Sequence, residues 1–571
     1  MHVRTLGQYI KPYGWRIAWQ MCVKISGTVI ELFLPSMLSI ILDEYAPAGN
    51  KTGVWVMGLG MILCAILAWL GNCCANRMST NVSREITRKL RFDLYSKVTA
   101  LSAAQQDAAT DASLISRLTS DTYNVHNMID RLQRIGIRAP MLLLGGIIVS
   151  LLLEPVLTLI LIATLPLLAA ITIWSSKKGV PLFTHVQEGQ DKMVRKVQEN
   201  MSGARVIRAL SRTQYERDDF GRVNDDLAAR QRTADLTMAR VSPATSFILN
   251  AGLAIVVLAG AYRVDSGASQ PGVIIAFLSY FTIILNALLM VTRIFVMYSK
   301  GSASARRIEE ILLLPADLTR SDAAAVAEHE HIVFDHVSFS YNKNFDNVTD
   351  LTFRLAHGQT LGIIGPTGSG KSTLLALLMR QYDVDKGEIR IGGKPLRSLT
   401  PEELHSRLGV VFQSDFLMAD TLRENIRFGR NIADPDIFDA IESAQASFIH
   451  RKEGALDHEL TVRGRNLSGG QQQRVLISRA LAGDPRILLL DDCSSALDFR
   501  TDRELRHALR ERHGQATTII VAQRVSAVMA ADHILVMDRG QIIGQGTHDE
   551  LMSTCPMYRE LCHLQLGGDA A

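Results

Sequence analysis

Six long apolar stretches before residue 300 constrain this chain more than any other feature of its sequence. A helix needs about 20 mostly apolar residues to cross the hydrocarbon core of a bilayer. A soluble core could bury one or two such runs, but six of them indicate a membrane domain. We therefore expect an α-helical domain with six spans, over residues 16–42, 54–75, 136–153, 156–174, 243–264 and 272–297.

Positive charge is distributed unevenly among the segments that join these spans. Two long segments, 76–135 and 175–242, are rich in Arg and Lys, whereas the short loops at 43–53 and 265–271 carry little positive charge. Loops rich in Lys and Arg stay on the cytoplasmic side of a membrane. We therefore expect a multi-pass protein of a cell membrane, such as a bacterial inner membrane, with both termini in the cytoplasm.

The two long segments are predicted to be helical rather than irregular. Apolar residues recur at helical spacing over 82–101 and 185–210, with few residues that break helices. The spans should therefore continue as helices beyond the bilayer, and the chain should reverse near 109–122 and near 211–221.

Charged residues inside the apolar stretches are expensive to bury in lipid. Lys24 and Arg293 lie near the cytoplasmic ends of their spans, where a long cationic side chain can extend to the interface. Glu31 lies deeper in the first span. We expect this carboxylate either to line an internal pathway or to pair with a group on another helix.

Other whole-chain features exclude several classes of protein. The net charge of +4 does not suggest a nucleic-acid partner. The seven cysteines show no metal-ligand spacing with histidine and no disulfide framework. The first apolar stretch is too long for a signal peptide, and no small-residue cleavage site follows it.

Composition changes after Lys300 and indicates a second domain. Strand-like segments such as Ile332–Phe339 and Thr360–Ile364 alternate with helices, which predicts an α/β fold. We expect a membrane domain over 1–305, a linker over 306–330 and an α/β domain over 331–571.

A phosphate-binding loop lies in this second domain. It runs from Gly365 to Ser372, follows an apolar strand and opens a predicted helix over Thr373–Met379. The glycines allow backbone N–H groups to turn toward phosphate oxygens. Lys371 is expected to reach the outer phosphates, and the hydroxyl of Ser372 to hold Mg²⁺.

Two further motifs complete the pattern. A buried strand that ends in Asp491 presents a carboxylate at the edge of the sheet, where Mg²⁺ is bound. The run Leu467–Gln471 precedes a helix, so Ser468 and the following glycine amides form a second anion site. Because one nucleotide does not need two such sites on one domain, the second should contact a nucleotide held by another subunit.

Gly365–Ser372, Leu467–Gln471 and Asp491 resemble the Walker A, signature and Walker B motifs of ATP-binding-cassette (ABC) transporters, and the resemblance covers nearly the whole chain. It implies a six-span helical domain joined to a P-loop ATPase domain. In the membrane half, Val197–Arg208 resembles the segment between the fourth and fifth helices of exporters, and Leu114–Asp121 resembles the first coupling helix.

The resemblance also implies roles for individual residues. Tyr341 matches the aromatic residue that stacks on adenine, Gln413 the Q-loop glutamine, and Ser495–Asp498 the D-loop. The implied ATP-binding residues are Tyr341, Gly365, Pro366, Thr367, Gly368, Ser369, Gly370, Lys371, Ser372, Thr373, Ser468, Gly469, Gly470 and Gln471. The implied Mg²⁺ positions, reached through ATP, are Ser372, Gln413 and Asp491, and the catalytic positions are Asp492, Gln523 and Gln413.

Two of these positions depart from the family pattern. The family usually has Glu after the Walker B aspartate and His at the switch position, whereas this chain has Asp492 and Gln523. The shorter carboxylate is displaced by about 1.5 Å, and misplacements of that order can cost about 10²-fold in rate. Glutamine cannot carry a positive charge toward the γ-phosphate. Both changes resemble the degenerate subunit of a heterodimeric exporter.

The resemblance therefore implies an ATP-driven half-transporter that exports an amphipathic compound such as a drug, lipid or peptide-like molecule. Its expected partners are a second half-transporter, the bilayer and the transported molecule, without nucleic acid. A homodimer is the alternative assembly. The alternative functions are an importer of a metal–chelate complex with the same fold and a regulatory membrane ATPase that moves no substrate.

Overall fold

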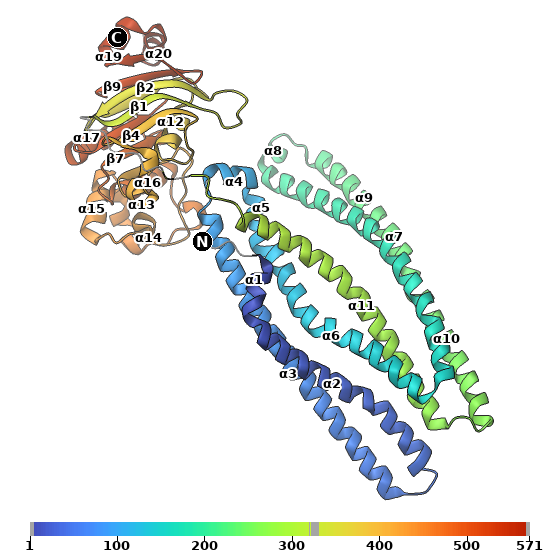
Figure 1. The fold of residues 1–571 in the computed structure, drawn as a ribbon. Coiled ribbons are helices and arrows are strands. Elements are labelled where there is room, and N and C mark those ends of the chain that lie inside the picture. Colours follow the sequence, from blue (N-terminus) through green and yellow to red (C-terminus); the bar gives the residue numbers. More distant parts are fainter. Residues whose placement is uncertain (1–4, 319, 321–329, 567–571) are drawn as a thin grey trace. The chain divides into compact units, whose positions relative to one another are not determined.

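The computed structural model describes residues 5–318, 320 and 330–566. The chain divides into two compact units (Figure 1). We call the unit formed by residues up to Thr99 together with Ala112–Leu314 the helical unit. The sheet unit consists of Ala100–Asp111 together with the residues from Pro315 onward. Ten residues of the predicted linker 306–330, at 319 and 321–329, lie outside the described residues, and the linker's first residues lie in the last helix of the helical unit, which ends at Leu312.

The helical unit confirms the six predicted spans. Among the described residues, six helical segments are long and apolar enough to cross a membrane, and each contains one predicted span. Its main helices are α1 (Leu6–Ile10), α2 (Gly14–Ile40), α3 (Lys51–Thr99), α5 (Asp111–Ser116), α6 (Thr122–Leu153), α7 (Pro155–Ser202), α8 (Ala204–Ala209), α9 (Thr213–Ala239), α10 (Val241–Asp265) and α11 (Pro271–Leu312), with π-helical turns at Ile41–Tyr45 and Arg117–Asp121.

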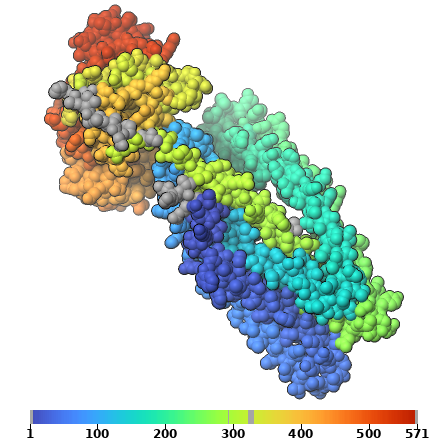
Figure 2. Space-filling model, viewed as in Figure 1, coloured from blue at the N-terminus to red at the C-terminus, as the bar shows by residue number. Residues whose placement is uncertain are grey.

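Small and aromatic residues set how these helices pack. Gly27 of α2 lies against Gly71 of α3, where an added Cβ would lie 3.3 Å from the backbone nitrogen of Asn72. Such glycines allow helix backbones to approach closely in a membrane. Phe277 and Tyr280 of α11 are fully buried in the core of the unit. The side chains of α11 and α6 meet along the bundle (Figure 2).

The spans continue beyond the bilayer as predicted, but both reversals lie upstream of the predicted positions. After α7, the chain reverses over 203–212, through Gly203 and the short helix α8, and Ser211 has a φ of +53°. The segment 211–221, predicted as the turn, lies mostly in α9. The prediction was wrong because the glycine that interrupts the long helix was not recognised as its end.

The first reversal also lies upstream of its predicted position. The segment that belongs to the sheet unit contains α4 (Ala103–Ala109), whereas Leu114–Asp121, predicted as the coupling helix, belongs to the helical unit. The hydroxyl of Ser102 caps α4, and Thr110 ends it with a φ of +59°. Within the sheet unit, Tyr382 Oη donates a hydrogen bond to Asp107 Oδ2 at 2.6 Å.

Two charged residues of the spans, Glu31 and Lys24, have partners on other helices. Arg138 of α6 donates to both carboxylate oxygens of Glu31, at 2.9 and 3.0 Å, so this carboxylate pairs between α2 and α6. Lys24 does not extend to the interface. It is 2% exposed and donates to Asn76 Oδ1 of α3 at 2.9 Å. That prediction was wrong because a polar neighbour inside the bundle accepts the ammonium.

The sheet unit has the predicted α/β architecture, built on two sheets. The first is antiparallel, in the order β2-β1-β4-β5, and the second has the order β10-β9-β3-β8-β7-β6, in which only β10 is antiparallel to its neighbour. The strands are β1 (Glu330–Phe339), β2 (Val348–Ala356), β3 (Thr360–Ile364), β4 (Lys386–Ile391), β5 (Lys394–Pro395), β6 (Leu408–Val411), β7 (Ile487–Asp491), β8 (Thr517–Val521), β9 (His533–Asp538) and β10 (Gln541–Gly546).

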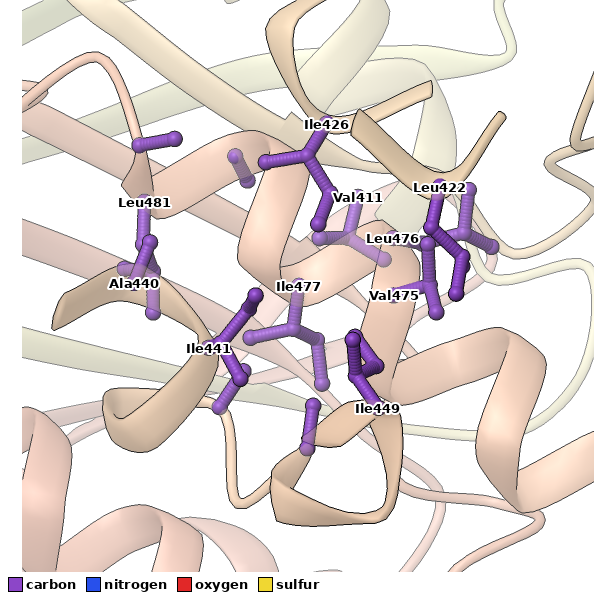
Figure 3. Packing of buried hydrophobic residues seen from close by; sticks show 14 of the residues in the cluster. Val411, Leu422, Ile426, Ala440, Ile441, Ile449, Val475, Leu476, Ile477 and Leu481 are labelled. Carbon is purple, nitrogen blue, oxygen red and sulfur yellow. The ribbon is translucent and has the colours of Figure 1, made fainter. Parts of the chain in front are cut away.

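Helices cover these sheets and connect the parallel strands. They are α12 (Lys371–Leu378), α13 (Pro401–His405), α14 (Leu422–Arg427), α15 (Asp434–Ser443), α16 (Gly469–Leu481), α17 (Phe499–His513), α18 (Val525–Val528), α19 (His548–Thr554) and α20 (Pro556–Leu566). Helix α16 is anchored by Val475, Leu476, Ile477 and Leu481, which pack into one apolar cluster with side chains of α14, α15 and β6 (Figure 3). This packing fixes the N-terminus of α16, where the predicted second anion site lies.

Truncating Ile477 should destabilise this cluster. The side chain is fully buried, and Ile→Ala substitutions in cores cost about 2–5 kcal/mol, against about 0.5–1.5 kcal/mol for Ile→Val. Urea unfolding of the purified protein in detergent, followed by a probe in the sheet unit, should rank wild type above Ile477→Val and Ile477→Ala. Leu564→Ala, at a side chain that is 75% exposed, is the control. Equal stability of Ile477→Ala and Leu564→Ala would contradict this role.

Candidate nucleotide-binding site

The carboxyl ends of β3, β8, β7 and β6 meet at one edge of the larger sheet. Ligands bind outside this edge in open α/β sheets, because the loops that follow the strands converge there. A cavity of ≈ 260 Å³ lies at this edge, with walls of backbone amides, hydroxyls and carboxylates. It is lined by Asn347, Thr367, Gly368, Gly370, Lys371, Ser372, Thr373, Gln413, Asp491, Asp492, Val521, Ala522 and Gln523.

The loop after β3 forms one wall of the cavity. Gly370 adopts a left-handed conformation with a φ of +98° and precedes the first turn of α12. The N–H groups at a helix start are a ready site for phosphate. Lys371 Nζ donates to the carbonyl oxygens of Gly365 and Pro366, at 2.8 and 2.7 Å. Burial lowers the pKa of Lys371, and the nearby carboxylates of β7 and its following loop oppose that shift.

Asp491, at the end of β7, carries a carboxylate suited to a metal ion. It is 8% exposed, and its side chain is hydrogen-bonded to Ser372. Burial raises the pKa of Asp491, while the bond from Ser372 and the charge of Lys371 act in the opposite direction. Mg²⁺ binds oxygen ligands from one or two protein groups together with substrate phosphates. Ser372 and Asp491 therefore fit this ion, which would neutralise charge on the β- and γ-phosphates.

Asp492 and Gln523 lie side by side in the cavity. Gln523 Nε2 donates to Asp492 Oδ2 at 3.4 Å. Burial, followed by the charge of Asp491, raises the pKa of Asp492. The backbone N–H of Asp492 donates to the carbonyl of Val521 at 2.9 Å, which fixes the loop after β7 against the end of β8. The two residues that depart from the family pattern are thus direct neighbours.

Aromatic side chains flank the phosphate loop. The ring of Tyr341 packs edge-on against Phe339 and Tyr382, with centroid distances of 4.9 and 5.0 Å. Tyr341 Oη donates to Thr373 Oγ1 at 3.3 Å, and the tyrosine remains 42% exposed. A flat ring held beside the start of α12 with free surface is suited to stacking on a nucleotide base.

The signature residues lie apart from this cavity. Ser468 caps α16: its Oγ accepts from the N–H of Gln471, whose side chain accepts from the N–H of Ser468. Among the described residues that line the cavity, none belongs to the run Ser468–Gln471. Gln473 of the same helix bonds Ser495 Oγ and the N–H of Ala496, which joins the signature helix to the D-loop.

Six of the fourteen predicted ATP-binding residues line this cavity, namely Thr367, Gly368, Gly370, Lys371, Ser372 and Thr373. Gly365, Pro366 and Ser369 shape the phosphate loop from behind, and Gly540 N donates to the carbonyl of Ser369 at 3.1 Å. Sequence reasoning missed Asn347, which follows β1 and also lines the cavity.

A second contact that sequence reasoning missed holds the switch loop. Gln565 of α20 donates to the carbonyl of Gln523 at 2.9 Å and accepts from the N–H of Val525 at 2.8 Å. No sequence motif connects α20 to the cavity, because the contact arises only when the C-terminal helix packs beside the loop after β8.

Comparisons with known proteins match this architecture. The family model described as the ABC transporter transmembrane region matches residues 17–288, and the one described as ABC transporter matches residues 348–495. YfiB of Bacillus subtilis, an uncharacterised ABC transporter ATP-binding protein, is 33% identical over 566 residues, which cover 99% of this chain and 98% of YfiB. This chain belongs to the ABC transporters.

Further comparisons agree with this assignment. An uncharacterised ABC transporter ATP-binding protein of Mycobacterium tuberculosis is 32% identical over 576 residues, covering 99% of this transporter and 98% of the relative. The structure of a bacterial Atm1-family ABC exporter with ATP bound has the same fold, with a TM-score of 0.81 and 24% identity over 97% of this chain and 99% of that one.

The transporter is therefore an ATP-driven, multi-pass membrane protein of the exporter type, and its sheet unit contains an ABC ATPase domain that binds ATP. ABC exporters function as dimers in a membrane, so this half requires a second one. The two alternative functions, metal–chelate import and a regulatory ATPase without substrate, are not favoured by these comparisons.

Two glycines of the phosphate loop should differ in their tolerance of alanine. Both have positive φ, +98° at Gly370 and +83° at Gly368, which costs an L-residue about 1–2 kcal/mol. A Cβ on Gly370 would also lie 2.8 Å from Val348 Cγ1, whereas one on Gly368 would meet nothing within 4 Å. Gly370→Ala should therefore destabilise the sheet unit by about 1–3 kcal/mol more than Gly368→Ala.

Nucleotide-free urea unfolding of the two variants measures this difference, because ligand contacts then play no part. If the two alanine substitutions lower the free energy of unfolding equally, the contact with Val348 does not restrict the residue at position 370.

Proposed function

We propose that this chain is the degenerate half of a heterodimeric ABC exporter, in which its own nucleotide site binds ATP and hydrolyses it slowly. The observation that carries this proposal is the direct contact between Asp492 and Gln523, at 3.4 Å, inside the nucleotide cavity. Both residues stand at positions where the family places its hydrolytic groups. A single change could be tolerated drift, but two changes in contact alter one chemical step.

The chemistry of Asp492 and Gln523 is the reason to expect slow ATP hydrolysis at this site. A water that attacks the γ-phosphate must be oriented by a positioned acceptor. The carboxylate of Asp492 is one methylene shorter than that of Glu and also accepts the hydrogen bond from Gln523. The amide of Gln523 stays neutral at every pH. The site therefore has neither a carboxylate of full reach nor a cation at the switch position, while Lys371, Ser372 and Asp491 remain to bind Mg²⁺ and ATP.

The signature residues support a separate role in the partner's site. Ser468 and the glycines that follow it form an exposed helix start outside this chain's own cavity. Such a helix start binds an anion. The anion would be the γ-phosphate of ATP held by the partner, where hydrolysis is expected to occur. ATP bound between the two halves would close them, and hydrolysis at the partner's site would reset the cycle.

The remaining features of the proposal concern location and cargo. The distribution of Arg and Lys favours a bacterial inner membrane with both termini in the cytoplasm. The apolar spans favour an amphipathic cargo such as a drug, lipid or peptide-like compound. Tyr341 would stack on the adenine, and Gln413 would contact Mg²⁺ and the attacking water from the loop after β6.

Purified alone, the chain should show little ATPase activity, because its own site lacks both usual hydrolytic groups. The double variant Asp492→Glu/Gln523→His should raise the turnover of the isolated chain by about 10²-fold, since it restores the reach of the carboxylate and the switch imidazole. Steady-state phosphate release in lipid nanodiscs measures both. If the isolated wild-type chain hydrolysed ATP as fast as the same chain assembled with its partner subunit, the degenerate assignment would be ruled out.

The variants Ser468→Arg and Asp492→Asn should separate the two sites of the assembled transporter. Ser468→Arg places a bulky cation in an anion site built for close backbone approach, so ATPase activity should fall by about 10²-fold or more. Asp492→Asn should cost less than about threefold, because little activity exists at that site to lose. Lys371→Ala should be intermediate, since it weakens ATP binding without removing the hydrolytic groups.

Each variant is paired with the unaltered partner and checked for assembly before turnover is measured. If Asp492→Asn is as damaging as Ser468→Arg, this chain carries a main hydrolytic site and the proposal is wrong.

A further inference from the structure

Three arginines of α6 form a stripe on one face of the helix. Arg131, Arg134 and Arg138 are spaced by three and four residues, which places them in one row along a helix. Arg134 Nη2 donates to Thr80 of α3, and Arg138 donates to Glu31 of α2. The row therefore follows the side of α6 next to α2 and α3.

The row runs from the cytoplasmic boundary into the inner half of the membrane. Helix α6 ends at Leu153, and the orientation predicted from the distribution of Arg and Lys places this end on the outer side. At a rise of ~1.5 Å per residue, Arg138 lies ~22 Å from this end, Arg134 ~28 Å and Arg131 ~33 Å. The hydrocarbon core is about 30 Å thick. Arg131 therefore lies near the cytoplasmic surface, and Arg138 lies ~8 Å inside the cytoplasmic boundary of the hydrocarbon core.

Cations outnumber anions along this row. Arg134 pairs with Asp130 and Arg138 with Glu31, whereas Arg131 has no ion pair among the described residues. Lys24, within electrostatic reach of Glu31 as well as of Arg134 and Arg138, donates a hydrogen bond to the neutral amide of Asn76. The two carboxylates therefore leave an excess of positive charge.

The guanidinium of Arg138 has unused capacity to donate. Its Nη2 bonds to Glu31, but its Nε is buried and has no hydrogen-bond acceptor among the described residues. A buried donor without a partner is costly and is rarely left so in a native state. Protein covers the Nε atom itself, so a ligand would reach the guanidinium through the exposed part of the Arg138 side chain, which is 32% exposed.

The row cannot face lipid. The side chains of Arg134, Arg138 and Glu31 are 32%, 32% and 29% exposed in this chain. Charged groups within the hydrocarbon region face protein or a water-filled cavity, because exposure to acyl chains is expensive. Their exposed parts therefore face the space between the two halves of the transporter, which is where an exporter holds its cargo.

We propose that the row Arg131–Arg134–Arg138 receives the acidic group of an amphipathic anion, such as a carboxylate or phosphate attached to an apolar body. Arg131 attracts the anion at the cytoplasmic entrance, and Arg138 binds it inside the membrane through donors that Glu31 leaves free. The apolar body lies against the surrounding spans. This inference rests on the proposed function as an exporter and specifies its substrate class.

A role in helix packing alone does not explain the row. The pair Arg138–Glu31 would join α2 to α6 without Arg131, and it leaves Arg138 Nε without an acceptor. The tendency of cytoplasmic boundaries to be positive accounts for Arg131 but not for Arg138 at its depth. A single anionic ligand accounts for the excess of positive charge and for the partial exposure of Arg134 and Arg138.

The test compares three amphiphiles that share one apolar chain and differ in charge. The assembled transporter, this chain with its partner, is reconstituted into phosphatidylcholine vesicles. ATP turnover is measured with dodecyl phosphate, dodecyltrimethylammonium and dodecanol. Dodecyl phosphate should stimulate turnover at a concentration about tenfold lower than the other two, a factor that corresponds to ~1.4 kcal/mol.

Variants of the row should remove this preference. Arg131→Gln breaks no ion pair, and the double variant Arg138→Gln/Glu31→Gln removes both members of a pair, so neither leaves a buried charge without a partner. Each should raise the half-maximal concentration of dodecyl phosphate about tenfold and leave that of dodecyltrimethylammonium unchanged. Lys178→Gln, an exposed cation on α7 at a similar distance from the outer helix end, is the matched control and should have no effect.

A second arm identifies the source of the anion. Phosphatidylglycerol is added to the vesicles in place of dodecyl phosphate. Stimulation by this lipid, lost in Arg131→Gln, would mean that the anion enters from the inner leaflet. Stimulation by dodecyl phosphate alone would mean that it enters from the cytoplasm.

Equal stimulation by all three amphiphiles, or a preference that the row variants leave intact, would overturn the anion site and leave export itself standing. Turnover that no amphiphile or lipid changes would contradict the proposed export function, and the anion site with it.

Discussion

The nucleotide site depends on the parallel register of β3, β8, β7 and β6. Because these strands run in the same direction, their carboxyl ends deliver four loops to one edge of the sheet, and each loop contributes a different group. The phosphate loop follows β3, the loop with Gln523 follows β8, Asp491 and Asp492 follow β7, and Gln413 follows β6. No single loop could place an ammonium, two carboxylates and two amides around one cavity.

The packing of helix α16 separates the two anion sites of the sheet unit. Helix α16 is held by its apolar face (Figure 3). Ser468, at its N-terminus, is not among the described residues that line the cavity. A helix start is one of the few places where backbone N–H groups remain unpaired. Ser468 and Gln471 accept hydrogen bonds from two of these N–H groups through a capping box. The glycines between them have no side chains that would block a ligand. Under the proposed function, the ligand of this helix start is the nucleotide held by the second subunit.

Much of this arrangement could be predicted from the sequence, for identifiable reasons. The six spans and the Walker A strand–loop–helix have strong local signals: long apolar runs in one case, and a glycine pattern between a strand and a helix in the other. The positions of the reversals could not be predicted, because Gly203 and Thr110 act through backbone conformation that the apolar pattern does not record. The partner of Glu31 could not be predicted either. Arg138 is more than a hundred residues distant in sequence, and only helix packing brings the two together.

The tie between Gln565 and the loop of Gln523 has a practical consequence. Two hydrogen bonds join the last described helix, α20, to the switch position, so the conformation of that loop depends on how α20 packs. Affinity tags, fusion partners and carboxy-terminal truncations are usually placed where they are assumed to be inert. In this transporter, a change that displaces α20 would also disturb the loop that carries Gln523 at the nucleotide cavity.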